Sequence, residues 1–155
     1  MSKALIQRVL TTDNSLSGLL MRLSAGVIFA AHGAQKLFGS FGGGGLEGTA
    51  QWMASIGLEP GYLMALAAGS AEFFGGIALL LGLLTRPAAF VLAMTMLVAV
   101  ITVHLPNGLF LSNNGYEFGL ALLAITGALV LNGGGKLSLD RMLSARLDKG
   151  RSDSF

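Results

Sequence analysis

LLMRLSAGVIFAAHGAQKLF, residues 19–38, is the stretch that decides the fold of this chain. It is long and apolar enough to cross a membrane as a helix, because a span needs about 20 residues of this kind. It also carries polar residues that hydrocarbon disfavours: Arg22, His32, Gln35 and Lys36. An ionisable group at the centre of a membrane helix costs roughly 2.5–3.5 kcal/mol, so these side chains need partners on other helices. The stretch therefore predicts a helix bundle built around a polar set.

The composition of the whole chain places it in the membrane class. Of its 155 residues, 53% are hydrophobic and only 12% are charged, with a mean hydropathy of +0.70. A soluble domain carries about 25% charged residues. There is no cysteine, which excludes disulfides and thiolate metal sites. No basic block is long enough for nucleic acid, and the length suits a single membrane domain over residues 1–155.

Four apolar segments predict four membrane spans. They cover about residues 16–38, 62–84, 87–105 and 116–131. Between the first two spans, four glycines at 42–45 precede an amphipathic segment at about 46–56. This segment is predicted to be a short helix in the outer interface, and the alternative is a lid that hinges on the glycines over an outward-facing pocket. The predicted fold class is an all-α membrane protein, a four-transmembrane-helix bundle with a short interfacial helix.

The basic residues predict the orientation in the membrane. Most of them fall on one side of the predicted spans: Lys3, Arg8, Arg86, Lys136, Arg141, Arg146, Lys149 and Arg151. The connections at 39–61 and 106–115 contain no Lys or Arg. The positive-inside rule then puts both termini in the cytoplasm, with a basic amphipathic tail at 137–155 on that surface. Lys36, at the outer end of the first span, is the exception, which indicates a function for it.

A buried ion pair is predicted in the inner half of the bundle. Glu72 lies near the middle of the second span among small residues that let a neighbouring helix approach closely. Arg22 can extend toward it, and His32 is a second candidate partner. An Arg22–Glu72 pair that fixes the helix register needs no ligand, so we assign this pair a structural role.

A second polar group is predicted near the outer surface, where three spans bring candidate ligand-binding residues to one depth: His32, Gln35, Lys36, His104 and Glu117. Histidine and glutamate suit proton transfer, and lysine suits an anionic or carbonyl oxygen. The alternative is that each side chain is simply hydrated at the interface. A metal site is disfavoured, because no helix carries the ligand spacing of a carboxylate-rich centre and Lys36 would repel a cation.

The order of these residues along the chain resembles the DoxX family over roughly residues 19–140. The resemblance rests on these positions: Arg22, Gly26, Phe29, His32, Gly33, Lys36, Leu37, Phe38, Gly39, Gly45, Gly48, Gly69, Glu72, Gly75, Gly76, Gly82, Arg86, His104, Asn107, Gly108, Gly115, Tyr116, Glu117, Gly133, Gly135, Leu137, Ser138, Leu139 and Asp140. It implies a four-helix protein of the bacterial inner membrane. Relatives are linked to terminal quinol oxidation, to thiosulfate:quinone oxidoreduction or to membrane-associated oxidoreductase complexes that handle redox stress.

Three functions remain open at this level. The first is the membrane subunit of a redox system, which binds a quinone or lipid-like ligand in the outer pocket, has no intrinsic cofactor and receives electrons from an oxidoreductase partner or a substrate. The second is a non-catalytic scaffold or assembly partner with an architectural polar set. The third is a small transporter or proton pathway that starts at Glu72. Glycines on the spans suit helix packing within one chain or in a homo-oligomer.

Overall fold

The computed structural model describes residues 9–152, and the side chains of residues 9–146. All regular structure in this part of the chain is helical. Within it, three helices are long and apolar enough to cross a membrane, Leu16–Phe38, Gly61–Leu81 and Thr85–Asn107, and Glu117–Asn132 is a shorter apolar helix. Lys3 and Arg8, which contributed to the predicted orientation, and the end of the predicted tail at 153–155 lie outside the described residues.

The main helices are, in chain order, α2 (Leu16–Phe38), α3 (Gly45–Ser55), α4 (Gly61–Leu81), α5 (Thr85–Ala99), α6 (Glu117–Asn132) and α7 (Leu139–Ser152). Single turns follow α2 and connect α5 to α6: η1 (Ser40–Gly42), η2 (Val100–His104), η3 (Leu105–Asn107) and η4 (Leu111–Asn113). The second span was expected to reach residue 84, but α4 ends at Leu81. Gly82 adopts a left-handed conformation, with φ of 62°, and closes the helix.

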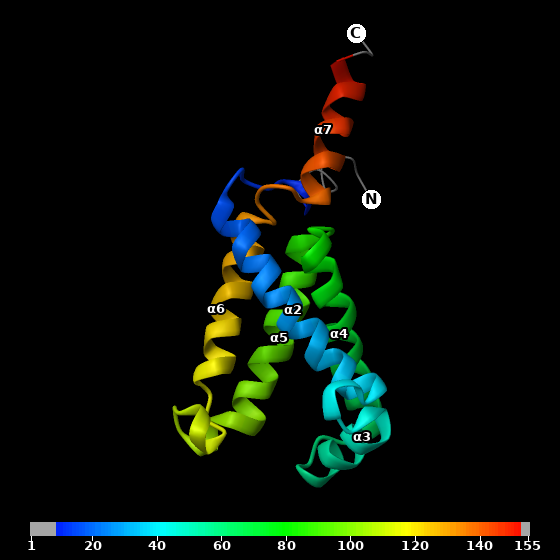
Figure 1. Cartoon of the computed structure of the whole chain (residues 1–155), viewed down its shortest axis with the longest axis vertical. Helices are drawn as coiled ribbons and strands as arrows, with labels where there is room; N and C mark the ends of the chain where they lie inside the picture. The colour runs from blue at the N-terminus through cyan, green and yellow to red at the C-terminus, as the bar shows by residue number, and fades with distance from the viewer. Residues whose placement is uncertain (1–8, 153–155) are drawn as a thin grey trace.

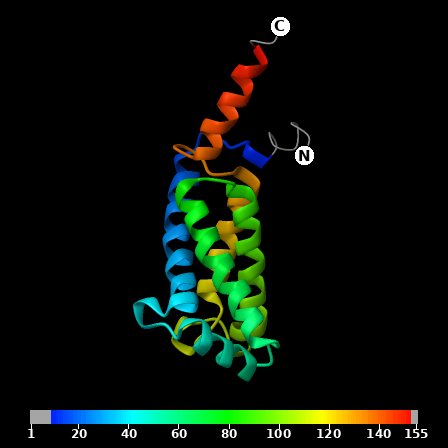
Figure 2. The same ribbon diagram turned by 90° about the vertical axis from the view of Figure 1, so that its right-hand side faces the viewer.

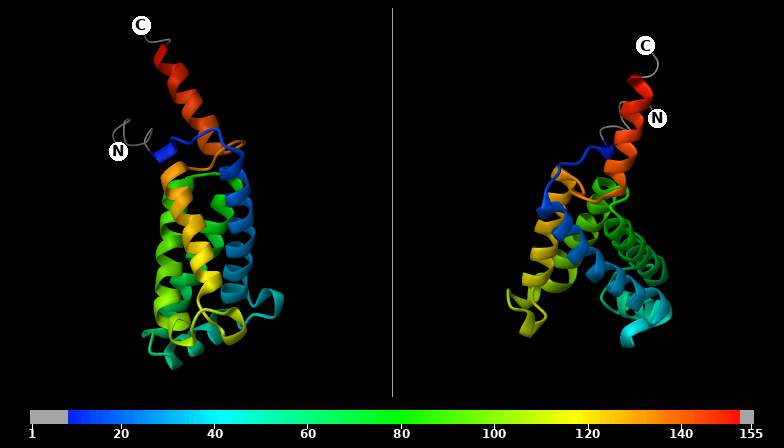
Figure 3. Two further views of the ribbon diagram at one scale, coloured as in Figure 1. Left: turned by 90° about the vertical axis from the view of Figure 1, so that its left-hand side faces the viewer. Right: turned by 45° about the horizontal axis from the view of Figure 1, so that its top comes forward.

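The apolar helices form two pairs that diverge from one end of the molecule. Helix α2 packs along α4, α5 packs along α6, and the pairs are joined by contacts of α4 with α5 and of α2 with α6. Figure 1 and the right panel of Figure 3 show the pairs spreading apart toward the end that carries α3. Figure 2 shows α3 lying across that end and α7 projecting beyond the opposite one. The divergence leaves room between the pairs.

A buried apolar core holds the two pairs together. Each apolar helix contributes to it: Phe29 from α2, Leu79 from α4, Leu92 from α5, and Leu122 and Leu129 from α6. Burying such a side chain contributes about 1.5–3 kcal/mol in a water-soluble protein, but in lipid the gain comes from close packing instead. A second cluster fastens α3 to α4 through Ala50, Met53 and Ala65.

Helices α2 and α4 touch through their backbones at two glycines. A Cβ added to Gly33 would lie 2.3 Å from the backbone nitrogen of Phe73, and one added to Gly76 would lie 2.4 Å from that of Ala30. Only glycine allows such an approach, as in other close-packed membrane helices. This contact fixes the crossing of α2 over α4, and with it the relative position of the polar residues on the two helices.

Gly33→Ala is therefore expected to destabilise the protein by about 1–3 kcal/mol, because the added methyl group meets backbone that cannot move without separating the helices. Gly127→Ala is the matched control, since a Cβ at Gly127 would meet nothing within 4 Å. In α6 that change should be neutral or stabilising by up to about 1 kcal/mol. Unfolding in detergent, followed by circular dichroism, measures both. Equal stability of the two variants would contradict the close contact.

Candidate functional site

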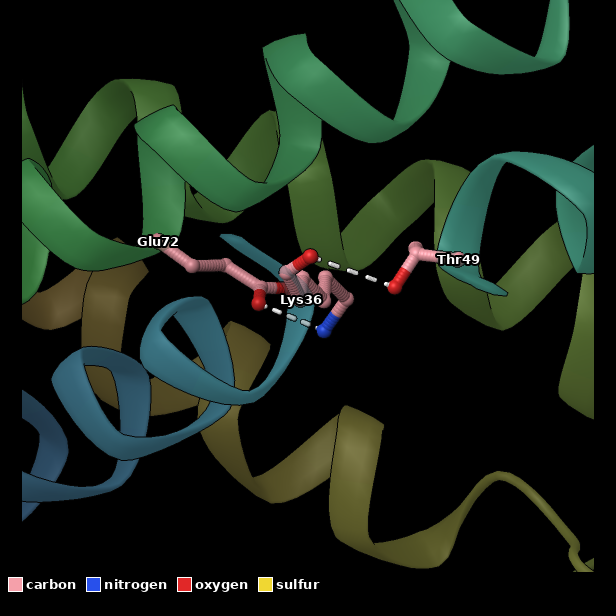
Figure 4. Close-up of polar contacts among 3 residues, drawn as sticks. All are labelled: Lys36, Thr49 and Glu72. Atoms are coloured by element: carbon pink, nitrogen blue, oxygen red, sulfur yellow. Dashed lines mark hydrogen bonds and ion pairs between the residues drawn. The ribbon is translucent and has the colours of Figure 1, made fainter. Parts of the chain in front are cut away.

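An ion pair joins α2 to α4, and its carboxylate is deeply buried. Lys36, in the last turn of α2, places its Nζ 2.6 Å from Oε2 of Glu72 on α4. The Glu72 side chain is 4% exposed and that of Lys36 is 23% exposed. Figure 4 shows Thr49 of α3 on the other side of Lys36, where its hydroxyl donates to the Lys36 carbonyl oxygen at 3.3 Å. The pair thus lies where three helices meet.

The predicted Arg22–Glu72 pair is wrong. Arg22 instead donates to five backbone carbonyls, those of Leu79, Leu80, Gly134, Lys136 and Leu137, at 2.5–3.3 Å. Leu79 lies seven residues beyond Glu72, or about 10 Å along α4, so the guanidinium extends toward the helix end rather than the helix centre. The reason is that carbonyls at a helix C-terminus lack partners within the helix and attract a cation.

A cavity of about 830 Å³ opens between the diverging helix pairs. Four ionisable side chains line it: His32, Lys36, Glu72 and His104. Most of the remaining wall is apolar and comes from every main helix except α7, for example Phe29, Trp52, Met64, Met94 and Leu122. A pocket of this size and character, with few polar groups in an apolar wall, is typical of a site for a small molecule.

The structure brings together three of the five predicted pocket residues. His32, Lys36 and His104 line the cavity, and the His32 ring also lies 6.5 Å, centre to centre, from that of Phe118 on α6. Glu72, which had been assigned to the ion pair with Arg22, joins them. The set therefore draws on α2, α4 and the turn after α5, and α6 covers one side of it.

Gln35 and Glu117 lie outside this cavity. Gln35 donates to the carbonyl of Phe41 and lines a smaller pocket of about 340 Å³, which also contacts Lys36. Glu117 accepts a hydrogen bond of 2.6 Å from the Leu111 backbone N–H, so it shapes the connection before α6. The prediction from depth alone that Gln35 and Glu117 share one pocket with His32, Lys36 and His104 is therefore wrong.

His104 is held in a defined orientation by a local change in the helix. Residues Val100–His104 form a π turn, with the Leu105 N–H donating to the Val100 carbonyl. Such turns widen a helix and occur often at functional sites. The Nδ1 atom of His104 lies 2.9 Å from the carbonyl oxygen of Asn114. Because a carbonyl only accepts, Nδ1 carries the hydrogen in this contact, which leaves Nε2 of the neutral ring as an acceptor.

At the opposite end of the bundle lies a purely structural network that the sequence analysis missed. Asp140 is 2% exposed and accepts hydrogen bonds from the backbone N–H groups of Leu84 and Thr85, at 2.6 and 2.8 Å. It thus supplies the cap that α5 lacks locally. Arg86 donates to the carbonyls of Val130 and Leu131 at the end of α6, at 2.8 Å each. The only hints in the sequence were the positions of Arg86 and Asp140 in the family pattern.

Among the described residues, no three histidine, aspartate or glutamate side chains gather as a metal site would require. The ionisable residues of the cavity are instead a lysine, a glutamate and two histidines around an apolar space. Such a set can donate hydrogen bonds to a carbonyl oxygen and exchange protons with it. These features define a small helical membrane protein with an amphipathic cavity between its helices.

Comparison with known proteins gives the family. The sequence pattern of the DoxX family matches residues 18–105, and the chain belongs to this family. It is 38% identical over 122 residues to "Putative oxidoreductase CatD" of Bacillus subtilis, which covers 79% of this chain and 83% of that protein. It is 31% identical over 134 residues to "Inner membrane protein YqjF" of Escherichia coli, covering 83% and 92%. No solved structure matches the chain.

Proposed function

We propose that this protein is the membrane subunit of a redox system and that it binds a quinone in the cavity between its helices. The observation that carries the proposal is the Lys36–Glu72 pair, which faces an apolar cavity of about 830 Å³. A quinone has an apolar body and carbonyl oxygens that need hydrogen-bond donors. Lys36 and a histidine supply such donors, and the apolar wall receives the rest of the molecule.

The chemistry of the cavity suits the two states of a quinone. Reduction to the quinol takes up two electrons and two protons on the two oxygens. Lys36 and Glu72 can lend and recover protons next to such an oxygen, and the histidines are further candidates for the same exchange. The electrons come, in this proposal, from an oxidoreductase partner or a substrate. One relative is named as an oxidoreductase, which supports this direction.

We infer a topology that agrees with this role. Helix α6 has 16 residues, a length of about 24 Å, and would be the fourth span beside α5. Arg22 and Arg86 bind groups at the end of the bundle from which α7 projects, and Arg141 and Arg146 lie on α7 itself. By the positive-inside rule that end is cytoplasmic, in an inner membrane. The cavity and α3 would then be on the outer side.

Trp52 offers a direct test because it is the only tryptophan in the chain and it lines the cavity. Decylubiquinone added to the protein in lipid nanodiscs is expected to quench Trp52 fluorescence in a saturable way. The double variant Lys36→Met/Glu72→Met should bind at least about tenfold more weakly, because a hydrogen bond to a charged group is worth about 1.5–3 kcal/mol.

Lys136→Met is the matched control, since Lys136 is exposed and lies far from the cavity at the other end of the bundle. It should retain wild-type quenching. The fluorescence of N-acetyltryptophanamide in protein-free nanodiscs measures the background quenching by quinone that needs no binding site. A wild-type signal that rises linearly with quinone and matches this background would contradict the proposed function.

A further inference from the structure

Most of the exposed apolar side chains in the cavity wall lie on α4 and α5. Val91, Met94 and Val98 of α5 line the cavity and are nevertheless 46%, 42% and 50% exposed. Ala67, on α4, likewise lines the cavity and is exposed. We take the side of the wall with the most exposed apolar side chains as the side on which the cavity opens. The opening therefore lies between α4 and α5, facing the hydrocarbon of the membrane.

Other boundaries of the cavity are bridged by contacts, and between α2 and α6 the rings of His32 and Phe118 lie 6.5 Å apart, centre to centre. The glycine contacts of Gly33 and Gly76 leave no space between α2 and α4. Between α6 and η2, the turn after α5, a Cβ added to Gly119 would lie 2.6 Å from a methyl group of Val100. Helix α3 covers the end of the cavity with Trp52 and Met53. Figure 1 shows that α4 and α5 meet near the connection between them and separate toward α3.

We propose that the ligand enters from the bilayer between α4 and α5, and that it is a quinone with a hydrocarbon tail which stays in this opening. This inference rests on the proposed function and adds the tail and the route. Lys36 and Glu72 pair where α2 packs on α4, away from α5, so a head group bound at Lys36 would have its tail directed toward the opening. An apolar tail leaving through Ala67, Val91 and Met94 remains in contact with apolar surface throughout.

The rate of Trp52 quenching tests the route. Ala67→Phe and Val91→Phe narrow the opening without adding a second tryptophan. In nanodiscs mixed with decylubiquinone, each should slow the approach to equilibrium by about tenfold, because entry then requires the helices to move apart. The extent of quenching at equilibrium should fall much less than the rate, since the polar end of the cavity is unchanged.

Two matched variants control for an added phenyl ring on a lipid-facing helix surface. Val27 of α2 is 60% exposed, Ala121 of α6 is also exposed, and neither lines the cavity. Val27→Phe and Ala121→Phe should keep the wild-type rate. Gly48→Phe tests entry from the aqueous end, because Gly48 lines the smaller outer pocket and has nothing within 4 Å of an added Cβ. It too should keep the wild-type rate.

The outcomes separate the route from the function. Normal rates in Ala67→Phe and Val91→Phe, with quenching intact at equilibrium, would overturn the lateral route and leave the proposed function standing. Slow quenching in Gly48→Phe alone would also overturn it, in favour of entry from water. Absence of any saturable quenching in the wild-type protein would overturn the proposed function, and this inference with it.

Discussion

Replacing Arg22 by alanine is expected to lower the free energy of unfolding by about 3 kcal/mol or more. Arg22 is 2% exposed, and its guanidinium joins the end of α4 to the segment before α7. Without it, several backbone carbonyls lose a charged donor in a place closed to water. Arg22→Lys should recover only part of the loss, because an ammonium lacks the planar fork that reaches both segments at once.

Thermal or detergent-induced unfolding, followed by circular dichroism, measures this effect. Arg146→Ala is the control, since Arg146 is exposed on α7. Its effect should stay within about 0.5 kcal/mol, as for most surface changes. A loss for Arg22→Ala no larger than that of Arg146→Ala would contradict the role of Arg22 as a connector of two segments.

Lys36→Met is expected to be the second most damaging change, with a loss of about 3 kcal/mol or more. It leaves Glu72, 4% exposed, without its counter-ion. The double variant Lys36→Met/Glu72→Met should regain most of this stability, because removing both charges also removes the cost of burying them. The same unfolding measurement on the two variants gives the coupling between the residues.

The double variant separates stability from function. If the ion pair were only architectural, restoring stability would restore all behaviour of the protein. We expect Lys36→Met/Glu72→Met to fold well and still fail to bind quinone. A double variant as unstable as the single one would contradict the direct pairing of Lys36 with Glu72. If the double variant binds quinone normally, the ion pair has only a structural role.

Much of the fold could be predicted because it depends on local sequence signals. The first span begins and ends where expected, since Ser15 accepts a hydrogen bond from the Gly18 N–H and Gly39 adopts a left-handed conformation with φ of 71°. The short helix after the glycine run is also present, at Gly45–Ser55. These features need only hydrophobic length and capping residues, which a single sequence displays.

The partners of the buried charges could not be predicted in the same way. A sequence shows only which side chains could pair, so it indicated Glu72 as the partner of Arg22 rather than the backbone carbonyls that Arg22 contacts. The free carbonyls at a helix end have no sequence signal of their own, because only the position of the helix end can be predicted. A long side chain can also place its charged end several ångströms toward either end of its helix. The positions of Arg22 and Lys36 on the first span could be predicted, but not the direction in which each side chain extends.

The candidate site was partly predictable for a related reason. The depth of His32, Lys36 and His104 follows from their positions on predicted spans, and these three line one cavity. Depth alone does not give the direction of a side chain, which is why Gln35 and Glu117 were included. Both contact nearby backbone in a connection, at Phe41 and Leu111. The cavity exists because the helix pairs diverge, and the hydrophobic pattern of each single helix does not predict the angle between the pairs.

If the cavity beside Lys36 and Glu72 holds a quinone, the ligand should remain bound when the protein is released from nanodiscs made directly from its own membrane. Native mass spectrometry should then find the wild-type protein with a bound molecule of the mass of a prenylated quinone, and Lys36→Met/Glu72→Met without it. A wild-type protein that carries no bound molecule, or only phospholipid that the double variant carries equally, would contradict quinone binding in this cavity.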